Sequence, residues 1–308
     1  MNTQSQSQSQ WLGALLVIMG AVGWGTLGIA STQLANAGLS NSSVTGLRIV
    51  GTFICLLAFL PFLNKVLRTL QFQDIPKLVI QSLLGMLGMT FCYFNAVQHV
   101  GPAIAVALLY TAPIWSVVLS FIFLKERITL KSMMLTLVAV SGVACMMLGD
   151  NQLNMTGVLF GLASGICYAA YGVIGKDIID HYSPTFLLFS SMMVSALAIF
   201  PFIHFQEIES LVSNIDFNIV IACILLIVFG TLLPFALYTY GLKYLKASQA
   251  SIYTIFEPLT AVILASLFAN VQLSNAQIFG VILIISVSLL NVILGKADLN
   301  PEKVYSTH

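Results

Sequence analysis

The residues best suited to chemistry in this sequence are polar side chains set inside long apolar stretches. Glu257 lies within such a stretch, and Gln249, Tyr253 and Glu257 follow one another at intervals of four residues. In a continuous helix this spacing places three side chains on one face. An acidic side chain at the centre of a bilayer costs about 2.5 to 3.5 kcal/mol, so it usually faces a wet cavity or a partner. Glu257 is therefore a candidate for binding a solute or exchanging a proton, and a structural hydrogen bond to a neighbouring helix is the alternative.

Other polar and aromatic side chains inside apolar stretches could line the same cavity. A ring with a hydroxyl or indole group offers an apolar face and one hydrogen bond, which suits an amphipathic or zwitterionic solute. For each of them, helix packing is the alternative use. Besides Gln249, Tyr253 and Glu257, the candidate cavity residues are Trp24, Tyr93, Asn95, Gln98, Tyr110, Tyr168, Tyr171 and Tyr238.

One arginine and two prolines could control such a cavity. Arg48 lies inside an apolar stretch near one end, where it could reach the lipid headgroups or instead steer an anionic solute or brace a gate. Pro113 and Pro258 lack an amide hydrogen and crowd the carbonyl four residues back, so each predicts a kink or hinge in its helix.

Several classes of function find no support in the sequence. The net charge is +1, which leaves no basic surplus for nucleic acid. The five cysteines lie in apolar stretches without CxxC spacing, and the histidines form no catalytic pair, so neither a metal site nor an enzyme is expected. A Gly-rich phosphate loop is missing, and no cofactor is predicted.

The composition predicts an all-α integral membrane protein. Hydrophobic residues make up 58% of the 308 positions and charged residues 7%, against about a quarter charged in soluble domains. A helix of about 20 apolar residues crosses a bilayer. Ten segments meet this criterion: Leu12–Ala30, Val44–Leu63, Leu78–Val97, Ala103–Leu124, Met133–Leu148, Val158–Ile174, Phe186–Ile203, Ile219–Leu242, Ala250–Ala269 and Ile278–Leu294.

Basic residues indicate how the spans are oriented. Apart from Arg48, every lysine and arginine lies in or beside the second, fourth, sixth or eighth loop or the C-terminal tail, and positive charge marks the cytoplasmic side. Both termini are therefore expected in the cytoplasm, and the seventh loop, with Glu207, is expected outside. The polar tail, residues 1–11, has no basic region or cleavage site of a secretory signal.

The two halves of the chain resemble each other at an offset of 144 to 145 residues. Trp24 aligns with Tyr168 and Gly28 with Gly172, and after one insertion Pro113 aligns with Pro258. Five spans per half is an odd number, so the second half should be inverted in the membrane. Glycines at helical spacing, such as Gly157, Gly161 and Gly165, predict close helix packing.

These features resemble the drug/metabolite transporter superfamily, in particular the ten-helix carriers built from two EamA repeats. The residues that carry the resemblance are Gly23-Trp24-Gly25, Leu47-Arg48, Pro113 with Glu126 thirteen residues later, and Glu257-Pro258. The sequence departs from the family pattern at Val271, thirteen residues after Pro258, which favours a local structural role for Glu126. The resemblance implies EamA repeats at 12–148 and 156–294, followed by a cytoplasmic tail at 295–308.

What the resemblance implies is a secondary transporter in the cytoplasmic (inner) membrane. It would export amino acids or related small metabolites by alternating access, as a monomer or homodimer in the lipid bilayer. Proton coupling through Glu257 is a further hypothesis, and an uptake carrier or facilitative uniporter is the alternative. An intramembrane enzyme or channel is the competing class, although an enzyme would need a second reactive group beside Glu257.

Overall fold

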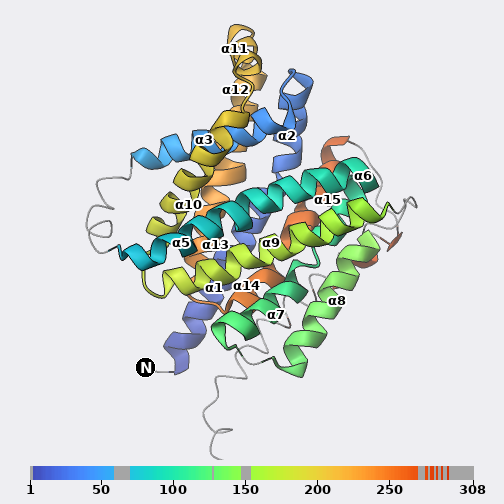
Figure 1. Cartoon of the computed structure of the whole chain (residues 1–308). Helices are drawn as coiled ribbons and strands as arrows, with labels where there is room; N and C mark the ends of the chain where they lie inside the picture. Colours follow the sequence, from blue (N-terminus) through green and yellow to red (C-terminus); the bar gives the residue numbers. More distant parts are fainter. Residues whose placement is uncertain are drawn as a thin grey trace, which may run out of the picture.

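The computed structural model of the chain is a bundle of helices (Figure 1). It describes residues 3–58, 70–126, 128–146 and 154–269, together with single residues between 275 and 290. This described part contains no strand. Most of the predicted tenth span, Ile278–Leu294, and the whole tail at 295–308 lie outside the described residues.

Five stretches of helix in the described part are long and apolar enough to cross a membrane. They are Ser9–Asn36, Phe72–Val100, Met155–Ile179, Pro184–Phe202 and Phe217–Leu242. Shorter apolar helices cover Asn41–Leu57, Ala112–Leu124 and Met133–Gly142. The described part is thus all-helical and contains several helices suited to cross a membrane, while ten spans in two inverted halves remain a prediction.

The first helical stretch starts earlier than the sequence suggests and is interrupted. Helix α1 spans Thr3–Gly25, so it includes most of the polar tail, in which glutamine is a good helix former. Thr26 separates α1 from α2, Leu27–Asn36, and a short turn then leads to α3, Asn41–Leu57.

The third and fourth predicted spans are divided differently in the structure. After η1 (Phe72–Asp74), α5 (Ile75–Ile80) and η2 (Gln81–Gly88), helix α6 runs from Met89 to Leu109, through the loop expected around Gly101 and Pro102. Helix α7 then covers only Ala112–Leu124, and α8 covers Leu130–Met146.

Packing against α9, Met155–Ile179, explains the continuous course of α6, which lies along it (Figure 1). Gly157 contacts Val100 and Gly161 contacts Leu108, so α6 is held close to α9 on both sides of its proline. A proline inside a helix costs about 3 kcal/mol, which contacts over several turns can outweigh. The close packing predicted for these glycines is confirmed.

The rest of the chain follows the predicted spans more closely. It comprises α10 (Pro184–Ile199), η3 (Phe200–Phe202), the short amphipathic α11 (Phe205–Ser213) and α12 (Phe217–Ile224). These lead to η4 (Leu225–Leu232), α13 (Leu233–Leu242), α14 (Ala247–Tyr253) and α15 (Phe256–Ala269). Helices α2, α11 and α12 gather at one end of the bundle, the α11 end, whereas α7 and α8 lie toward the other (Figure 1).

Two wide helical turns occur at matching places in the two halves. The segments η2 and η4 are both π-helices of 8 residues, and their first residues, Gln81 and Leu225, are separated by the same offset of 144 that aligns the halves. A π-helix is rare and often marks a functional site. In η2 it brings Gly85 against the backbone of Tyr171, where a Cβ atom would lie 2.8 Å from Cα of Tyr171.

Candidate functional site

A cavity of about 370 Å³ lies inside the bundle. Its walls come from α1 and α2, α3, η2 and α6, α9, α13 and α15. Arg48 and Glu257 are the two charged residues among its described lining residues, and most of the others are aromatic or apolar. The aromatic lining residues are Trp24, Tyr93, Phe94, Tyr110, Tyr168, Tyr171 and Phe235.

Glu257 stands in the first turn of α15, directly before Pro258, and both residues line the cavity. Its side chain is enclosed by the protein, and the part that remains accessible faces the cavity. The hydroxyls of Tyr110 and Tyr168 and the guanidinium of Arg48 lie near enough to stabilise its charge. The carboxylate therefore faces the interior of the protein, beside two hydroxyl groups and one guanidinium group.

Arg48 reaches the cavity from α3, near enough to Glu257 for the two charges to interact. Its Nε atom is buried and has no hydrogen-bond partner among the described residues. Because an unpaired buried donor costs about 1 to 3 kcal/mol, a guanidinium placed like this favours a ligand that accepts its hydrogen bonds.

Three tyrosine hydroxyls share this lack of partners. Those of Tyr110, Tyr168 and Tyr171 are buried, and none has a partner in hydrogen-bonding geometry within the described ranges. Each hydroxyl lies close to polar side chains without meeting that geometry: Tyr110 to Glu257, Tyr168 to Thr254 and Glu257, and Tyr171 to Thr239 and Gln81. Buried polar groups are normally satisfied by protein, water or ligand, so these hydroxyls and Arg48 together indicate a site for a polar molecule.

A cluster of aromatic rings packs around the cavity residues Trp24 and Tyr171. The ring centroids of Trp24 lie 5.0 Å from Phe235 and 5.5 Å from Tyr238, and Tyr171 contacts the same two rings at 5.5 and 6.0 Å. Edge-to-face and tilted contacts of this kind stabilise by about 0.5 to 1.5 kcal/mol per pair. The cluster fixes Trp24 and Tyr171 as rigid walls, with Tyr238 as a supporting residue.

The cavity lies where helices are interrupted. Helix α6 ends at Leu109, and α7 begins three residues later, just before Pro113. Helix α14 ends at Tyr253, and α15 begins three residues later, just before Pro258. Each proline crowds the carbonyl four residues back and has no amide hydrogen to donate to it. The prolines therefore explain why the helices are interrupted within the four residues before Pro113 and before Pro258.

Threonine hydroxyls satisfy carbonyl groups at each interruption. Thr26 between α1 and α2, Thr111 between α6 and α7, and Thr254 between α14 and α15 each donate to the carbonyl three residues earlier, at 2.7, 2.6 and 2.8 Å. Side-chain bonds of this type bend helices and replace lost backbone bonds. Irregular backbone inside a membrane is tolerated where it lines a cavity, which agrees with its place here.

Comparisons with known proteins place this site in a family context. The sequence profile of the EamA-like transporter family matches residues 11–148 and again residues 155–293. The chain belongs to the EamA-like transporter family. It is therefore a membrane transporter and not an enzyme.

Relatives and a solved structure agree with this assignment to the EamA-like family. An uncharacterized transporter of Archaeoglobus fulgidus is 30% identical over 273 residues, which cover 87% of this chain and 92% of that protein. An uncharacterized inner membrane transporter of Salmonella typhimurium, YicL, is 24% identical over 90% of this chain and 94% of its own length. A crystal structure of a protein with 17% identity matches with a TM-score of 0.68, covering 96% of this chain and 98% of that one. This last likeness concerns the fold alone.

The structure brings together about half of the cavity residues predicted from the sequence. Trp24, Tyr93, Tyr110, Tyr168, Tyr171 and Glu257 line the cavity, as does Arg48. The remaining five are not among its described lining residues, and their side chains have other surroundings: Asn95, Gln98, Tyr238, Gln249 and Tyr253.

The interruption of the ninth predicted span explains the largest discrepancy. Gln249, Tyr253 and Glu257 share one face only if the helix is continuous, whereas Thr254 and Ile255 form a turn between α14 and α15. Gln249 instead accepts a bond from the amide of Lys246 at 3.3 Å and caps α14, and Tyr253 is buried in the core.

The two amides of α6 also have local roles. Asn95 donates to the carbonyl of Phe91 at 2.8 Å, and Gln98 is exposed. Both lie between the two groups of α6 residues that line the cavity, near the predicted end of the third span. Sequence reasoning missed the small polar residues Ser31, Thr32 and Asn41, which line the cavity around α2 and α3. Their signal was weak, because Ser and Asn at a span end also predict a loop.

Glu126 has the structural role that the sequence favours. Its carboxylate accepts from the amide of Ala247 at 3.3 Å and from the hydroxyl of Ser248 at 2.7 Å. Both belong to the first turn of α14, where a negative charge stabilises the helix. Glu126 thus joins the end of α7 to the start of α14 and takes no part in the cavity.

Proposed function

We propose that this transporter carries a small zwitterionic metabolite, such as an amino acid, and that the cavity is its binding site. The observation that carries the proposal is the pair of opposite charges, Arg48 and Glu257, facing one cavity whose tyrosine hydroxyls make no hydrogen bond within the described residues. A carboxylate would bind the Arg48 guanidinium, and an ammonium group would bind the Glu257 carboxylate. Aromatic walls would accommodate the apolar part of the solute.

Alternating access between two inverted five-helix halves is the mechanism that we infer. The matching π-helical segments and the matching breaks before Pro113 and Pro258 support it, because each pair joins one element from either half. Interrupted helices at the cavity can change angle without unfolding, so they suit a carrier that opens to either side. Ten spans, with both termini in the cytoplasm and the α11 end outside, complete this proposal.

Export from the cytoplasm is the direction proposed, with uptake or facilitated diffusion as the alternatives. Reconstitution in liposomes tests transport itself. Liposomes preloaded with an unlabelled amino acid should accumulate the labelled compound by counterflow, and Glu257→Gln should strongly reduce the rate of this accumulation. If wild-type protein produces no counterflow with any amino acid or related metabolite, the proposed function is wrong.

Proton coupling through Glu257 is the second part of the proposal. A protonated Glu257 cannot hold an ammonium group by charge, so taking up a proton would release the substrate from that side. Arg48, Tyr93, Tyr110 and Tyr168 are the titratable groups that surround it. A pH-sensitive dye inside the liposomes should report proton movement that requires substrate and is lost in Glu257→Gln. Substrate flux without proton movement would favour a uniporter.

A further inference from the structure

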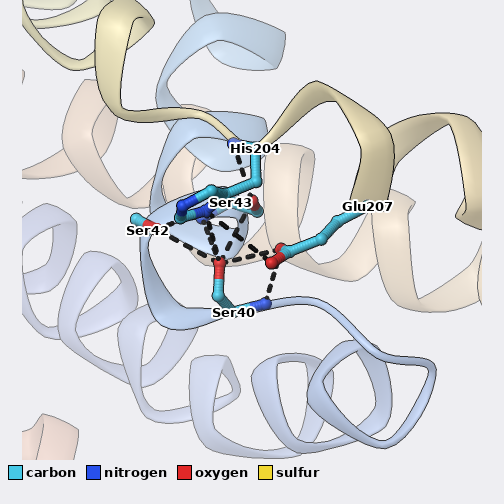
Figure 2. A network of polar contacts seen from close by, with 5 residues as sticks. All are labelled: Ser40, Ser42, Ser43, His204 and Glu207. Carbon is cyan, nitrogen blue, oxygen red and sulfur yellow. Dashed lines mark hydrogen bonds and ion pairs between the residues drawn. The ribbon is translucent and has the colours of Figure 1, made fainter.

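The cavity is open at one end and closed at the other. Its exposed lining residues in α2 and at the start of α3 are Gly28, Thr32 and Asn41. This open end lies beside α11, because Ser40, the residue before Asn41, is bonded to Glu207 of α11 (Figure 2). One carboxylate oxygen of Glu207, Oε2, accepts from the backbone amide and from the hydroxyl of Ser40, both at 2.8 Å. In this structure a solute therefore reaches the cavity from the α11 end.

The closed end of the cavity is apolar. Met86, Leu109 and Phe235 line it, and each is at most 7% exposed. They belong to η2, α6 and α13, so both halves of the chain contribute. All three are part of one cluster of buried apolar residues, and none of their side chains carries a charge or a hydroxyl group. We call these three residues the apolar floor.

The two charged residues lie between the open end and the apolar floor. Arg48 follows Asn41 by two turns of α3, which places it about 10 Å farther from the open end. The exposure of Arg48 and Glu257 is intermediate between that of the open end and that of the floor. A zwitterion held by this pair can therefore direct its side chain either toward the open end or onto the floor.

Burial favours the floor when the side chain of the solute is apolar. Such a side chain leaves water there, and the free energy gained is proportional to the apolar area removed from water. A polar side chain directed toward the open end stays in water and adds little to binding. A charged side chain on the floor would have no partner, because Arg48 and Glu257 are the charged residues of the described lining and bind the solute's own ionic groups. The floor thus favours apolar side chains over acidic and basic ones.

Met86 closes the floor on the side of α10. The hydroxyl of Ser195 in α10 lies 3.4 Å from the sulfur of Met86 and 3.4 Å from the carbonyl oxygen of Ser82. Because the neighbouring Gly85 packs against the backbone of Tyr171, the segment that carries Met86 has no room to withdraw on that side. A methionine side chain is flexible and polarizable, so it fits apolar groups of different shapes. Met86 therefore limits how far the side chain of a solute can extend.

We propose that the solute is an amino acid with a large apolar side chain, such as leucine, methionine or phenylalanine, and that Met86 determines the length of side chain that is accepted. This inference rests on the proposed function, because it assumes that Arg48 and Glu257 hold the ionic groups of one zwitterion. The cavity volume of about 370 Å³ agrees with it, since sites for small molecules range from about 300 to 1,000 Å³. A volume near the lower limit favours a single amino acid over a larger compound.

Counterflow in liposomes tests the class of side chain. Liposomes with wild-type protein are preloaded in turn with leucine, phenylalanine, serine, aspartate or lysine, and uptake of the same labelled amino acid is measured. We expect kcat/KM for leucine and phenylalanine to exceed that for the other three by about tenfold or more. Burial of one large apolar side chain is sufficient for a factor of this size.

Variants of Met86 and of a neighbouring methionine test the floor. Met86→Ala extends the cavity toward α10 and should raise kcat/KM for tryptophan relative to leucine about tenfold, because the larger ring system gains space while leucine loses contacts. Met89, one turn farther along, is half-buried and lines the same wall, so Met89→Ala disturbs packing less. It should shift the ratio in the same direction by a smaller factor.

A matched control removes the same side chain away from the cavity. Met192 is fully buried in α10 and is not among the described lining residues. Met192→Ala should lower the stability of the protein, as loss of a buried side chain does, and leave the ratio of tryptophan to leucine unchanged.

Two outcomes would overturn the inference and leave the proposed function in place. One is counterflow of serine, aspartate or lysine that equals that of leucine. The other is a ratio of tryptophan to leucine that neither Met86→Ala nor Met89→Ala changes, or that Met192→Ala changes as much. A lack of counterflow with every amino acid would instead show that the proposed function is wrong, and this inference with it.

Discussion

Two glutamates with opposite surroundings show how this membrane protein uses carboxylates. The Glu207 carboxylate accepts from the backbone amide and the hydroxyl of Ser40, and that hydroxyl also accepts from the amide of Ser43. Around Glu257 the nearby hydroxyls of Tyr110 and Tyr168, and the Nε of Arg48, make no bond in hydrogen-bonding geometry within the described residues. A satisfied carboxylate holds structure together, whereas unsatisfied neighbours around a carboxylate indicate a place for a ligand.

The largest expected effect is the loss of transport in Glu257→Gln, which Glu207→Gln should not share. Glu257→Gln keeps the shape of the side chain and removes its charge, so the substrate ammonium loses its charged partner. Such bonds contribute about 1.5 to 3 kcal/mol, and we expect kcat/KM for transport to fall by up to about a hundredfold. Counterflow in liposomes measures it. In Glu207→Gln the KM should stay within about threefold of wild type, and a comparable loss in both variants would contradict the distinction.

Arg48, the second charged residue of the cavity lining, provides the next test. Arg48→Gln should weaken binding of a carboxylate by about tenfold to thirtyfold, because a neutral amide replaces a charged donor. Arg48→Lys keeps the charge without the planar donor geometry and should recover part of the loss. Inhibition of counterflow by unlabelled substrate gives the affinities. Unchanged affinity in Arg48→Gln would show that the guanidinium does not bind the solute.

Tyr168 permits a test in which stability and binding should respond differently. Its hydroxyl has no partner in the described structure, so Tyr168→Phe should leave the unfolding temperature unchanged. If the hydroxyl bonds to the solute, its removal should raise KM about threefold to tenfold, as expected for one neutral hydrogen bond of about 0.5 to 1.5 kcal/mol. Thermal unfolding and counterflow on the same preparation measure both. A lower unfolding temperature with unchanged KM would assign the hydroxyl to the fold.

The smallest effect concerns how the stabilising contribution of the Glu207 carboxylate, which accepts hydrogen bonds from Ser40, depends on pH. The folded pKa of Glu207 is lowered from 4.5 to about 2, so its stabilising contribution is fully present above about pH 4.5. As the pH falls from there through about 2, the carboxylate becomes protonated and the contribution is lost. The difference in unfolding temperature between wild type and Glu207→Gln should shrink as the pH falls below 4.5 toward 2. A difference that stays the same down to about pH 2 would contradict it.

The sequence predicts the class of this protein better than the course of its helices. Composition and hydropathy identify a helical membrane protein, and the residues around Trp24, Pro113 and Glu257 identify its family. Both prolines also predict where helices break, because their effect on the backbone is local. The continuous course of α6 through Pro102 could not be predicted, since it depends on the glycines of α9, which lie more than fifty residues away in the sequence.

The same limit applies to the cavity. Side chains such as Tyr110 and Tyr168 could be nominated one by one, because each is a polar group inside an apolar stretch. Gln249 was predicted to line the cavity from a periodic pattern that requires a continuous helix, but the helix ends with α14. The sequence therefore did not predict its actual partner, the amide of Lys246. Periodicity describes a face only within one unbroken helix. The hydrogen bonds between Ser40 and Glu207 could not be predicted either, since Glu207 lies in α11, in the other half of the chain.

The pairing of Arg48 and Glu257 with one solute is tested most directly by substrate analogues. Counterflow is measured in liposomes for an amino acid that is carried, for the amine that lacks its carboxylate and for the acid that lacks its ammonium group. The account predicts that only the zwitterion is carried well, and that each analogue loses about tenfold or more. Equal transport of all three compounds would contradict it, because the cavity would then recognise neither charge.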